Sequence, residues 1–149
     1  MRDEGVDCPA LRYDATIRKR NETEKADERQ IRFSLVHGVF DRLRRVRNRG
    51  FSVEAGKWKE ITGKAYPARS AAEGYLKVSF FGPFYSTYVV FELDREAYRF
   101  AYVSGPSRSY LWFLSRTPTV DEAQMRSFVE TADRLGFDTS RLIRVRQGP

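Results

Sequence analysis

The chain has 149 residues, of which 41% are hydrophobic and 14% aromatic, and its formal net charge is +7. This size suits one domain with a sizeable core, and the apolar content excludes a wholly disordered chain. No stretch approaches the roughly 18 apolar residues of a membrane-spanning helix, and the single cysteine, Cys8, excludes an internal disulfide and a multi-thiolate zinc site.

The first 47 residues carry two alternating patterns, separated by the charged stretch 21–30. Apolar residues alternate with polar ones at Leu11, Tyr13, Ala15 and Ile17, and again at Ile31, Phe33 and Leu35. Such alternation predicts strands, so this segment either supplies two strands or is a mostly disordered tail. No apolar run precedes Cys8, so the chain as written has no signal peptide or lipoprotein signal, and we expect a cytoplasmic location if this N-terminus is authentic.

Positive charge is spread over both halves, with a net +4 in residues 1–50 and +3 in residues 51–149. The densest basic run consists of Arg42, Arg44, Arg45, Arg47 and Arg49. We interpret it as a solvated face. The alternative, a nucleic-acid-binding module, is disfavoured because the aromatic residues lie on later strands instead of among the arginines. The single His37 lacks neighbours for a metal site or a catalytic triad, so we expect it to be exposed or hydrogen-bonded.

From Trp58 onward, five short segments alternate between apolar and polar residues. They are 58–66, closed by Pro67; 75–81, ended by Gly82-Pro83; 87–93; 98–103; and 108–116. In the second, Leu76, Val78 and Phe80 share one face, which we therefore expect to be buried. Short strands at this spacing, joined by tight turns, are typical of a β-sandwich or β-barrel.

The period changes to that of a helix after residue 118. Thr119 and Glu122 predict a capping box at its start. Apolar residues then recur at steps of three and four, at Met125, Phe128, Val129, Ala132 and Leu135. Gly136 suits a left-handed helix end, with Phe137 packing back. A short strand at 142–146 follows, so the order is five strands, one helix and one strand.

Five segments carry a family signature in register: Gly63-Lys64-Ala65-Tyr66, Leu76-Lys77-Val78-Ser79-Phe80-Phe81-Gly82-Pro83-Phe84-Tyr85, Leu93-Asp94-Arg95-Glu96, Tyr110-Leu111-Trp112-Phe113-Leu114-Ser115-Arg116-Thr117-Pro118 and Gly136-Phe137-Asp138-Thr139-Ser140. In their order and spacing, over roughly residues 48–147, they resemble the bacterial lipocalins of the outer-membrane lipoprotein type. The resemblance implies an all-β fold, an eight-stranded up-and-down antiparallel β-barrel followed by one C-terminal helix and a short ninth strand. That order agrees with the periodicity above.

The resemblance also implies a ligand inside the barrel, in place of a solid core. Such a barrel is just wide enough for one small ligand, and each buried methylene contributes about 0.8 kcal/mol. Strand alternation assigns to the lumen Leu76, Val78, Phe80, Val89, Phe91, Phe100, Tyr102, Tyr110, Trp112 and Leu114. We expect Tyr85 near the mouth, and Trp112 to touch the ligand. The alternative is that these residues fill a solid barrel core.

Arg116 matches a structural arginine of the family, which packs on the Trp of a Gly-x-Trp motif in the first strand. Gly56-Lys57-Trp58 imitates that motif, but the following Gly63–Tyr66 segment resembles the family's fourth strand, so we interpret the imitation as a decoy. Residues 1–47 contain no match. We therefore divide the chain into an atypical segment, 1–47, and the barrel strands, helix and final strand, 48–149. The first segment either supplies two substitute strands or is a misassigned reading frame, which leaves the barrel incomplete at its first two strands.

The function implied by the resemblance is lipid storage or transport in bacterial envelope maintenance, in the outer membrane or periplasm. The implied partner is a fatty acid or a lysophospholipid. Membrane association would use the family's lipid anchor, which this chain lacks, and a homodimer is allowed. The sequence shows no paired carboxylates, nucleophile–base pair or phosphate loop, so we expect no enzyme activity, catalytic residue, metal or cofactor. A truncated lipocalin remnant without ligand binding is a further alternative.

Overall fold

The computed structural model describes residues 11–19, 31–36, 44–52, 54–68 and 74–144. Side chains are described within these ranges from Arg45 onward, apart from position 51. Cys8, His37 and Arg42 lie outside the described residues, so the structure does not bear on the predictions made for them.

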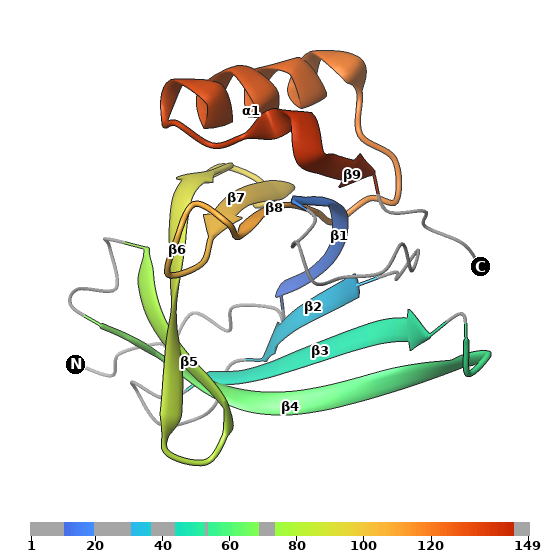
Figure 1. The fold of residues 1–149 in the computed structure, drawn as a ribbon, viewed down its shortest axis with the longest axis vertical. Helices are drawn as coiled ribbons and strands as arrows, with labels where there is room; N and C mark the ends of the chain where they lie inside the picture. Colours follow the sequence, from blue (N-terminus) through green and yellow to red (C-terminus); the bar gives the residue numbers. More distant parts are fainter. Residues whose placement is uncertain (1–10, 20–30, 37–43, 53, 69–73, 145–149) are drawn as a thin grey trace, which may run out of the picture.

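Strands dominate the described part of the chain, and one long helix follows them (Figure 1). The elements are β1 (Leu11–Lys19), β2 (Ile31–Val36), β3 (Arg44–Ser52), β4 (Lys57–Pro67), β5 (Tyr75–Phe81), β6 (Phe84–Leu93), β7 (Phe100–Ser104), β8 (Leu111–Ser115), α1 (Glu122–Arg134), the 3₁₀ turn η2 (Thr139–Arg141) and β9 (Leu142–Arg144).

The strands pair in chain order from β2 through β8, and each pairing is antiparallel. β1 pairs with β2 through Leu11–Ala15 and with β8 through Asp14–Arg18. The pairings therefore run around eight strands and return to β1, which also carries β9. Figure 1 shows the curl of this sheet, with α1 on one side of it. The predicted up-and-down antiparallel β-barrel with a C-terminal helix is confirmed.

β3 was not among the predicted strands, because its arginines hide its alternation. Val46 is buried and Asn48 is half-buried, whereas Arg45 and Arg47 are exposed. A single apolar position therefore marks the inward face of this strand. β3 runs across position 47, where the sequence suggested a boundary between two segments.

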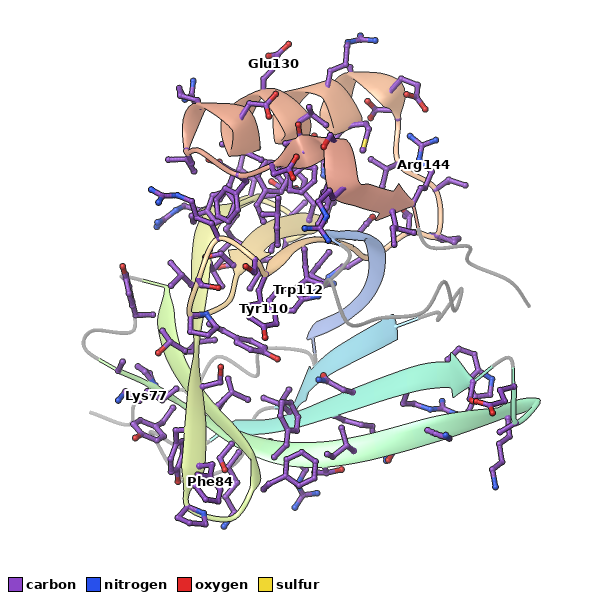
Figure 2. All side chains as sticks on the ribbon, viewed as in Figure 1. Lys77, Phe84, Tyr110, Trp112, Glu130 and Arg144 are labelled. Carbon is purple, nitrogen blue, oxygen red and sulfur yellow. The ribbon has the colours of Figure 1, made fainter. Side chains whose placement is uncertain are left out.

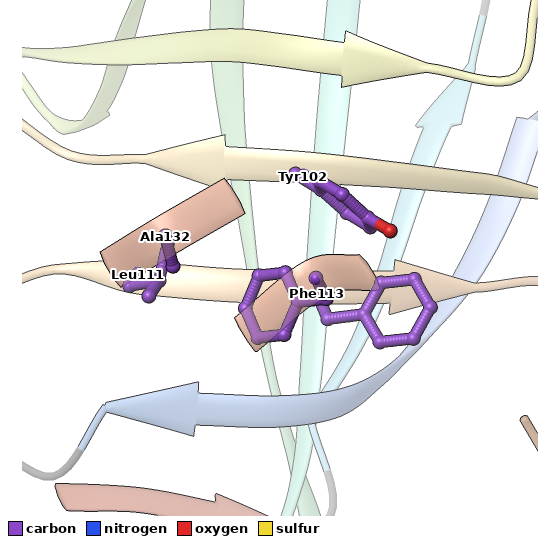
Figure 3. Close-up of a cluster of buried hydrophobic side chains, with 5 residues drawn as sticks. Tyr102, Leu111, Phe113 and Ala132 are labelled. Atoms are coloured by element: carbon purple, nitrogen blue, oxygen red, sulfur yellow. The ribbon is translucent and has the colours of Figure 1, made fainter. Parts of the chain in front are cut away.

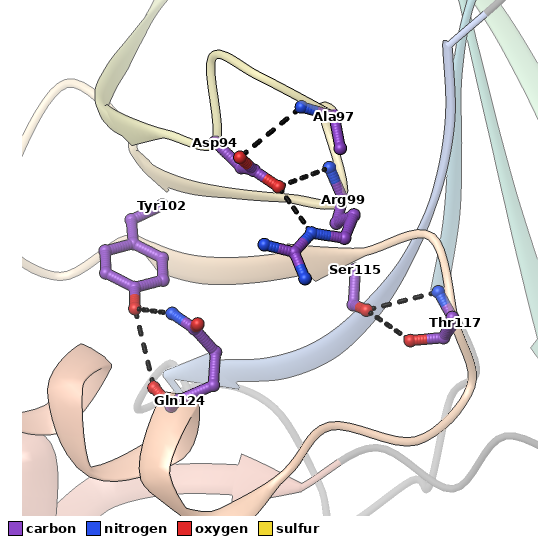
Figure 4. Close-up of polar contacts among 7 residues, drawn as sticks. All are labelled: Asp94, Ala97, Arg99, Tyr102, Ser115, Thr117 and Gln124. Atoms are coloured by element: carbon purple, nitrogen blue, oxygen red, sulfur yellow. Dashed lines mark hydrogen bonds and ion pairs between the residues drawn. The ribbon is translucent and has the colours of Figure 1, made fainter.

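Two strands begin at other positions than predicted, for reasons of turn chemistry. β6 starts at Phe84 instead of residue 87, because Gly82 at φ +56° and Pro83 form a tight turn and Phe81 pairs directly with Phe84. β7 starts at Phe100 instead of residue 98, because Tyr98 has a φ of +52°, in the left-handed region. Arg99 donates to the Asp94 carboxylate through its backbone N (3.3 Å) and its Nε (2.7 Å), which fixes this turn (Figure 4).

The helix α1 begins later than predicted and ends as predicted. Its N-cap is Asp121, whose Oδ1 accepts from the Gln124 backbone N at 2.7 Å, so the capping box expected at Thr119 and Glu122 is wrong. At the other end Gly136 has a φ of +80°, and the Phe137 backbone N donates to the Ala132 carbonyl at 3.0 Å. This is the left-handed helix end expected from the sequence.

A buried aromatic cluster joins α1 to the outer side of β7 and β8 (Figure 3). The Phe128 ring of α1 lies 4.9 Å from Tyr102 of β7 and 5.2 Å from Phe113 of β8, between ring centroids. Gln124 Nε2 donates to the Tyr102 hydroxyl at 2.6 Å, which satisfies that buried polar group (Figure 4). Burying each such ring contributes about 1.5–3 kcal/mol, so this cluster is the main apolar contact that holds the helix against the barrel.

Candidate functional site

The inner face of the barrel is a continuous apolar surface. One group of its residues packs around Ala101, Val103 and Leu114, and the other packs around Val46, Ala65 and Val78. Tyr88 packs against both groups, so they join. We call this surface the inner face; its members are Val46, Ala65, Leu76, Val78, Phe80, Tyr88, Val90, Leu93, Ala101, Val103, Trp112 and Leu114.

Several residues predicted to line the lumen lie together on this face. Leu76, Val78 and Phe80 come from β5, where they alternate with outward residues. Trp112 and Leu114 come from β8. Tyr110 precedes β8 and stacks on Trp112 with ring centroids 6.0 Å apart, and Figure 2 shows both side chains on the side of β8 that faces away from the helix. The ligand contact predicted for these residues stays a prediction.

Other predicted lumen residues lie on the opposite side of the sheet. Phe91, Phe100 and Tyr102 pack in the cluster beneath α1, and Phe91 stacks on Phe137 with centroids 6.0 Å apart. Val89 directly precedes the inner-face residue Val90 and therefore points outward. The lumen assignment of these four residues is corrected accordingly.

The correction has two physical causes. The β6–β7 register shifts between Val90 and Glu92, so strict alternation fails at Phe91. In addition, β7 and β8 contribute to the inner face on one side and pack against α1 on the other. Odd-numbered and even-numbered residues of these strands are therefore both apolar. Periodicity alone does not assign such a strand to a side. In β7, residue size separates the two sides: the small residues Ala101 and Val103 lie inward, and the aromatic residues Phe100 and Tyr102 pack beneath the helix.

Two polar side chains accompany the inner face. Asn48 hydrogen-bonds Tyr88, and the Tyr88 ring lies 5.4 Å from Trp112. Burial raises the pKa of the Tyr88 hydroxyl above its ordinary value of 10.0, and the hydrogen bond with Asn48 opposes that rise. Asn48 Oδ1 is buried and has no hydrogen-bond partner within the described part of the chain. Asn48 therefore offers a neutral acceptor beside the apolar residues of the inner face.

Tyr85 lies beside the β5–β6 turn and not within the inner-face groups. Its side chain is 47% exposed, and its ring contacts Tyr66 of β4 with centroids 5.5 Å apart. Tyr66 directly follows the buried Ala65 and so points outward. This contact places Tyr85 on the outer side of the barrel.

The imitation motif Gly56-Lys57-Trp58 also lies on the outer side. Arg49 of β3 lies over the Trp58 ring at 5.2 Å, and Glu60 binds both Arg47 (3.0 Å) and Arg49 (3.3 Å). The expected arginine run is therefore partly a set of cross-strand ion pairs on β3 and β4. Arg116 follows β8, and its backbone N donates to the Arg99 carbonyl at 2.9 Å. The cation–π role suggested for Arg116 stays a prediction.

The described residues show neither a metal-binding cluster nor a membrane-spanning helix. Among them, no three His, Cys, Asp or Glu side chains gather as a metal site would require. No helix in the described ranges is long and apolar enough to cross a bilayer.

Comparison with known proteins gives the family. The model of the lipocalin-like domain matches residues 15–147. The outer membrane lipoprotein Blc of Vibrio cholerae is 61% identical over 102 residues, which cover 68% of this chain and 60% of that protein. The protein of the same name from Escherichia coli K12 is 49% identical over 100 residues, covering 67% of this chain and 56% of that protein. The chain thus spans less than two thirds of the length of these relatives.

Solved structures agree on the fold. Lobster apocrustacyanin A1 superimposes with a TM-score of 0.70 at 18% identity, covering 94% of this chain and 78% of that one. The cockroach allergen Per a 4 superimposes with a TM-score of 0.71 at 15% identity, covering 92% of this chain and 84% of that one. With the family match over most of its length, the chain belongs to the lipocalin family.

Proposed function

We propose that this protein binds a lipid by enclosing its acyl chain against the inner face of the barrel. The observation that carries the proposal is the joining of two apolar groups through Tyr88 into one surface inside a ring of antiparallel strands. Each methylene removed from water contributes about 0.8 kcal/mol, so a long chain binds there without a catalytic group. The protein acts as a binding protein and not as an enzyme.

We propose a fatty acid or a lysophospholipid as the ligand class. The inner-face residues named above are apolar, which suits an alkyl tail. Asn48 and Tyr88 supply neutral hydrogen-bonding groups for a hydroxyl or a protonated acid. The matched relatives are named outer membrane lipoproteins, which supports a role in the bacterial envelope, in the outer membrane or periplasm.

We also propose that residues 1–47 supply the first two strands of this barrel. β1 and β2 pair with each other, and they connect β8 to β3. The lipocalin match begins at residue 15, within β1. Both observations favour substitute strands over a segment unrelated to the barrel.

The test compares the chain's two tryptophans, one inner and one outer. A fluorescent fatty acid is titrated into the wild type, Trp112→Ala and Trp58→Ala, followed by displacement with an unlabelled fatty acid and a lysophospholipid. Because Trp112 packs in the inner face and Trp58 lies beneath Arg49 outside, Trp112→Ala should weaken binding on the order of tenfold. Trp58→Ala should leave affinity unchanged. No saturable binding by the wild type, or equal affinity in all three proteins, would overturn the proposal.

A further inference from the structure

The tip of the β5–β6 hairpin exposes a group of large apolar side chains. Phe81 is 71% exposed and Phe84 is 77% exposed, and they flank Pro83 in the turn (Figure 2). Tyr85 follows at 47% exposed. Exposed apolar residues that are adjacent, in contrast to scattered ones, mark an interaction surface.

The hairpin holds these residues in a fixed arrangement. Phe81 pairs with Phe84 across the turn, where Gly82 adopts a φ of +56°. Ser79 Oγ donates to the Gly82 carbonyl at 2.9 Å, which ties the turn to its own strand. The backbone of the tip is therefore ordered before contact, so docking costs little backbone entropy.

Exposed cations lie on the outer side of the strands next to this tip. Lys64 pairs with Ser79, two residues before Phe81, and Arg45 lies directly opposite Lys64 on β3. Lys77 is exposed on β5. Like charges directly opposite each other destabilise a sheet, so the Arg45–Lys64 pair is not explained by stability. The acidic residue of these strands, Glu60, lies further along β4 with Arg47 and Arg49.

We propose that this tip docks on an anionic phospholipid bilayer, with Phe81, Pro83 and Phe84 in the interfacial layer and Arg45, Lys64 and Lys77 facing the headgroups. Aromatic rings favour the bilayer interface. The exposed cations Arg45, Lys64 and Lys77 complement an anionic surface. The same charges repel a second copy of this side of the barrel, which favours a bilayer as the partner.

Topology gives this docking a consequence for lipid exchange. In an up-and-down antiparallel barrel, the β3–β4, β5–β6 and β7–β8 turns leave the strands at one end. Tyr110 and Trp112 lie at the β7–β8 turn and the start of β8. The docked tip therefore sets that end of the barrel on the membrane. The proposal concerns a surface separate from the inner face and does not require a ligand inside the barrel.

The test is co-sedimentation with vesicles of phosphatidylcholine alone or mixed with phosphatidylglycerol. The full chain should bind the mixed vesicles and release as salt rises. Phe81→Ser with Phe84→Ser should weaken binding roughly a hundredfold, about tenfold for each ring. Lys64→Gln should weaken it about fivefold. Leu135→Ser, which removes a 43% exposed apolar side chain at the helix end, is the matched control and should bind as the wild type does.

A gain-of-signal variant keeps the proposal testable if the double serine variant does not fold. Phe84→Trp, in a background of Trp58→Phe and Trp112→Phe, should shift its emission to the blue on mixed vesicles. Absence of vesicle binding by the wild type, unchanged binding by the double variant, or a tip tryptophan that stays in water would overturn the proposal. The proposal would also be overturned if sedimentation velocity shows a wild-type dimer that the double variant no longer forms, because the tip would then be an interface between two copies of the chain. Fluorescent fatty-acid binding, measured without vesicles, should persist in the tip variants, so failure of the tip is distinguished from failure of the lumen.

Discussion

Replacing Phe128 by alanine tests the division of aromatic residues between the two sides of the sheet. Phe128 is 0% exposed and has two close ring partners, Tyr102 and Phe113. Deleting a fully buried Phe ring costs about 3–5 kcal/mol. At about 2–4 °C per kcal/mol for a chain of this length, the Tm should fall by roughly 6–20 °C.

The assay combines a thermal melt with a fatty-acid titration of the folded variant. Because Phe128 contacts the outer side of β7 and β8, Phe128→Ala should destabilise the protein but keep ligand affinity within about twofold of the wild type. Arg126→Ala, an exposed substitution on the same helix, is the control and should change stability by less than about 0.5 kcal/mol. If Phe128→Ala lowers the free energy of unfolding by less than about 1 kcal/mol, the packing of α1 against β7 and β8 is refuted. A loss of affinity with an unchanged Tm would refute the assignment of this cluster to the outer side.

Three further predictions concern stability. The pKa of Tyr88 is raised by burial from its ordinary value of 10.0, so the native state keeps that proton when the unfolded chain loses it. The free energy of unfolding should therefore fall as pH rises above about 10. In urea titrations, Tyr88→Phe should reduce this loss of stability at alkaline pH. The pKa of Asp94 is lowered, chiefly by its side-chain hydrogen bond with Arg99. Its contribution to the stability of the fold should therefore be present above the ordinary pKa of 3.8 and be lost as pH falls below that value. Asp94→Asn should make the Tm fall less steeply at acid pH. Gly136→Ala places a Cβ at a φ of +80° and should cost about 1–2 kcal/mol by urea denaturation; an unchanged midpoint would contradict the left-handed helix end.

The sequence predicts much of the fold because local chemistry agrees with the tertiary arrangement. β5 is found over the predicted range, since Leu76, Val78 and Phe80 alternate between clear turn signals. The helix end follows from Gly136 for the same reason. The β-barrel itself required the resemblance to a family, because periodicity is equally consistent with a sandwich.

The parts that the sequence did not predict depend on contacts between distant elements. β3 presents Arg45 and Arg47 to solvent, so its buried Val46 gave little signal. Asp121 caps α1 because the preceding loop places Thr119 outside the helix, where its carbonyl accepts from Thr117 Oγ1 at 2.7 Å. The face of β7 depends on where α1 returns to the sheet, which places Tyr102 outward and Ala101 inward.

The central claim, an acyl chain held against the inner face, is tested most directly by quenching from a fatty acid brominated in mid-chain. Two single-tryptophan proteins are compared. In Trp58→Phe the remaining Trp112 reports the inner face, and in Trp112→Phe the remaining Trp58 reports the outer side. We expect strong, saturable quenching of Trp112 at about one ligand per chain, and no quenching of Trp58 beyond that from random collisions. Equal quenching of the two tryptophans, or quenching of Trp58 alone, would contradict the central claim.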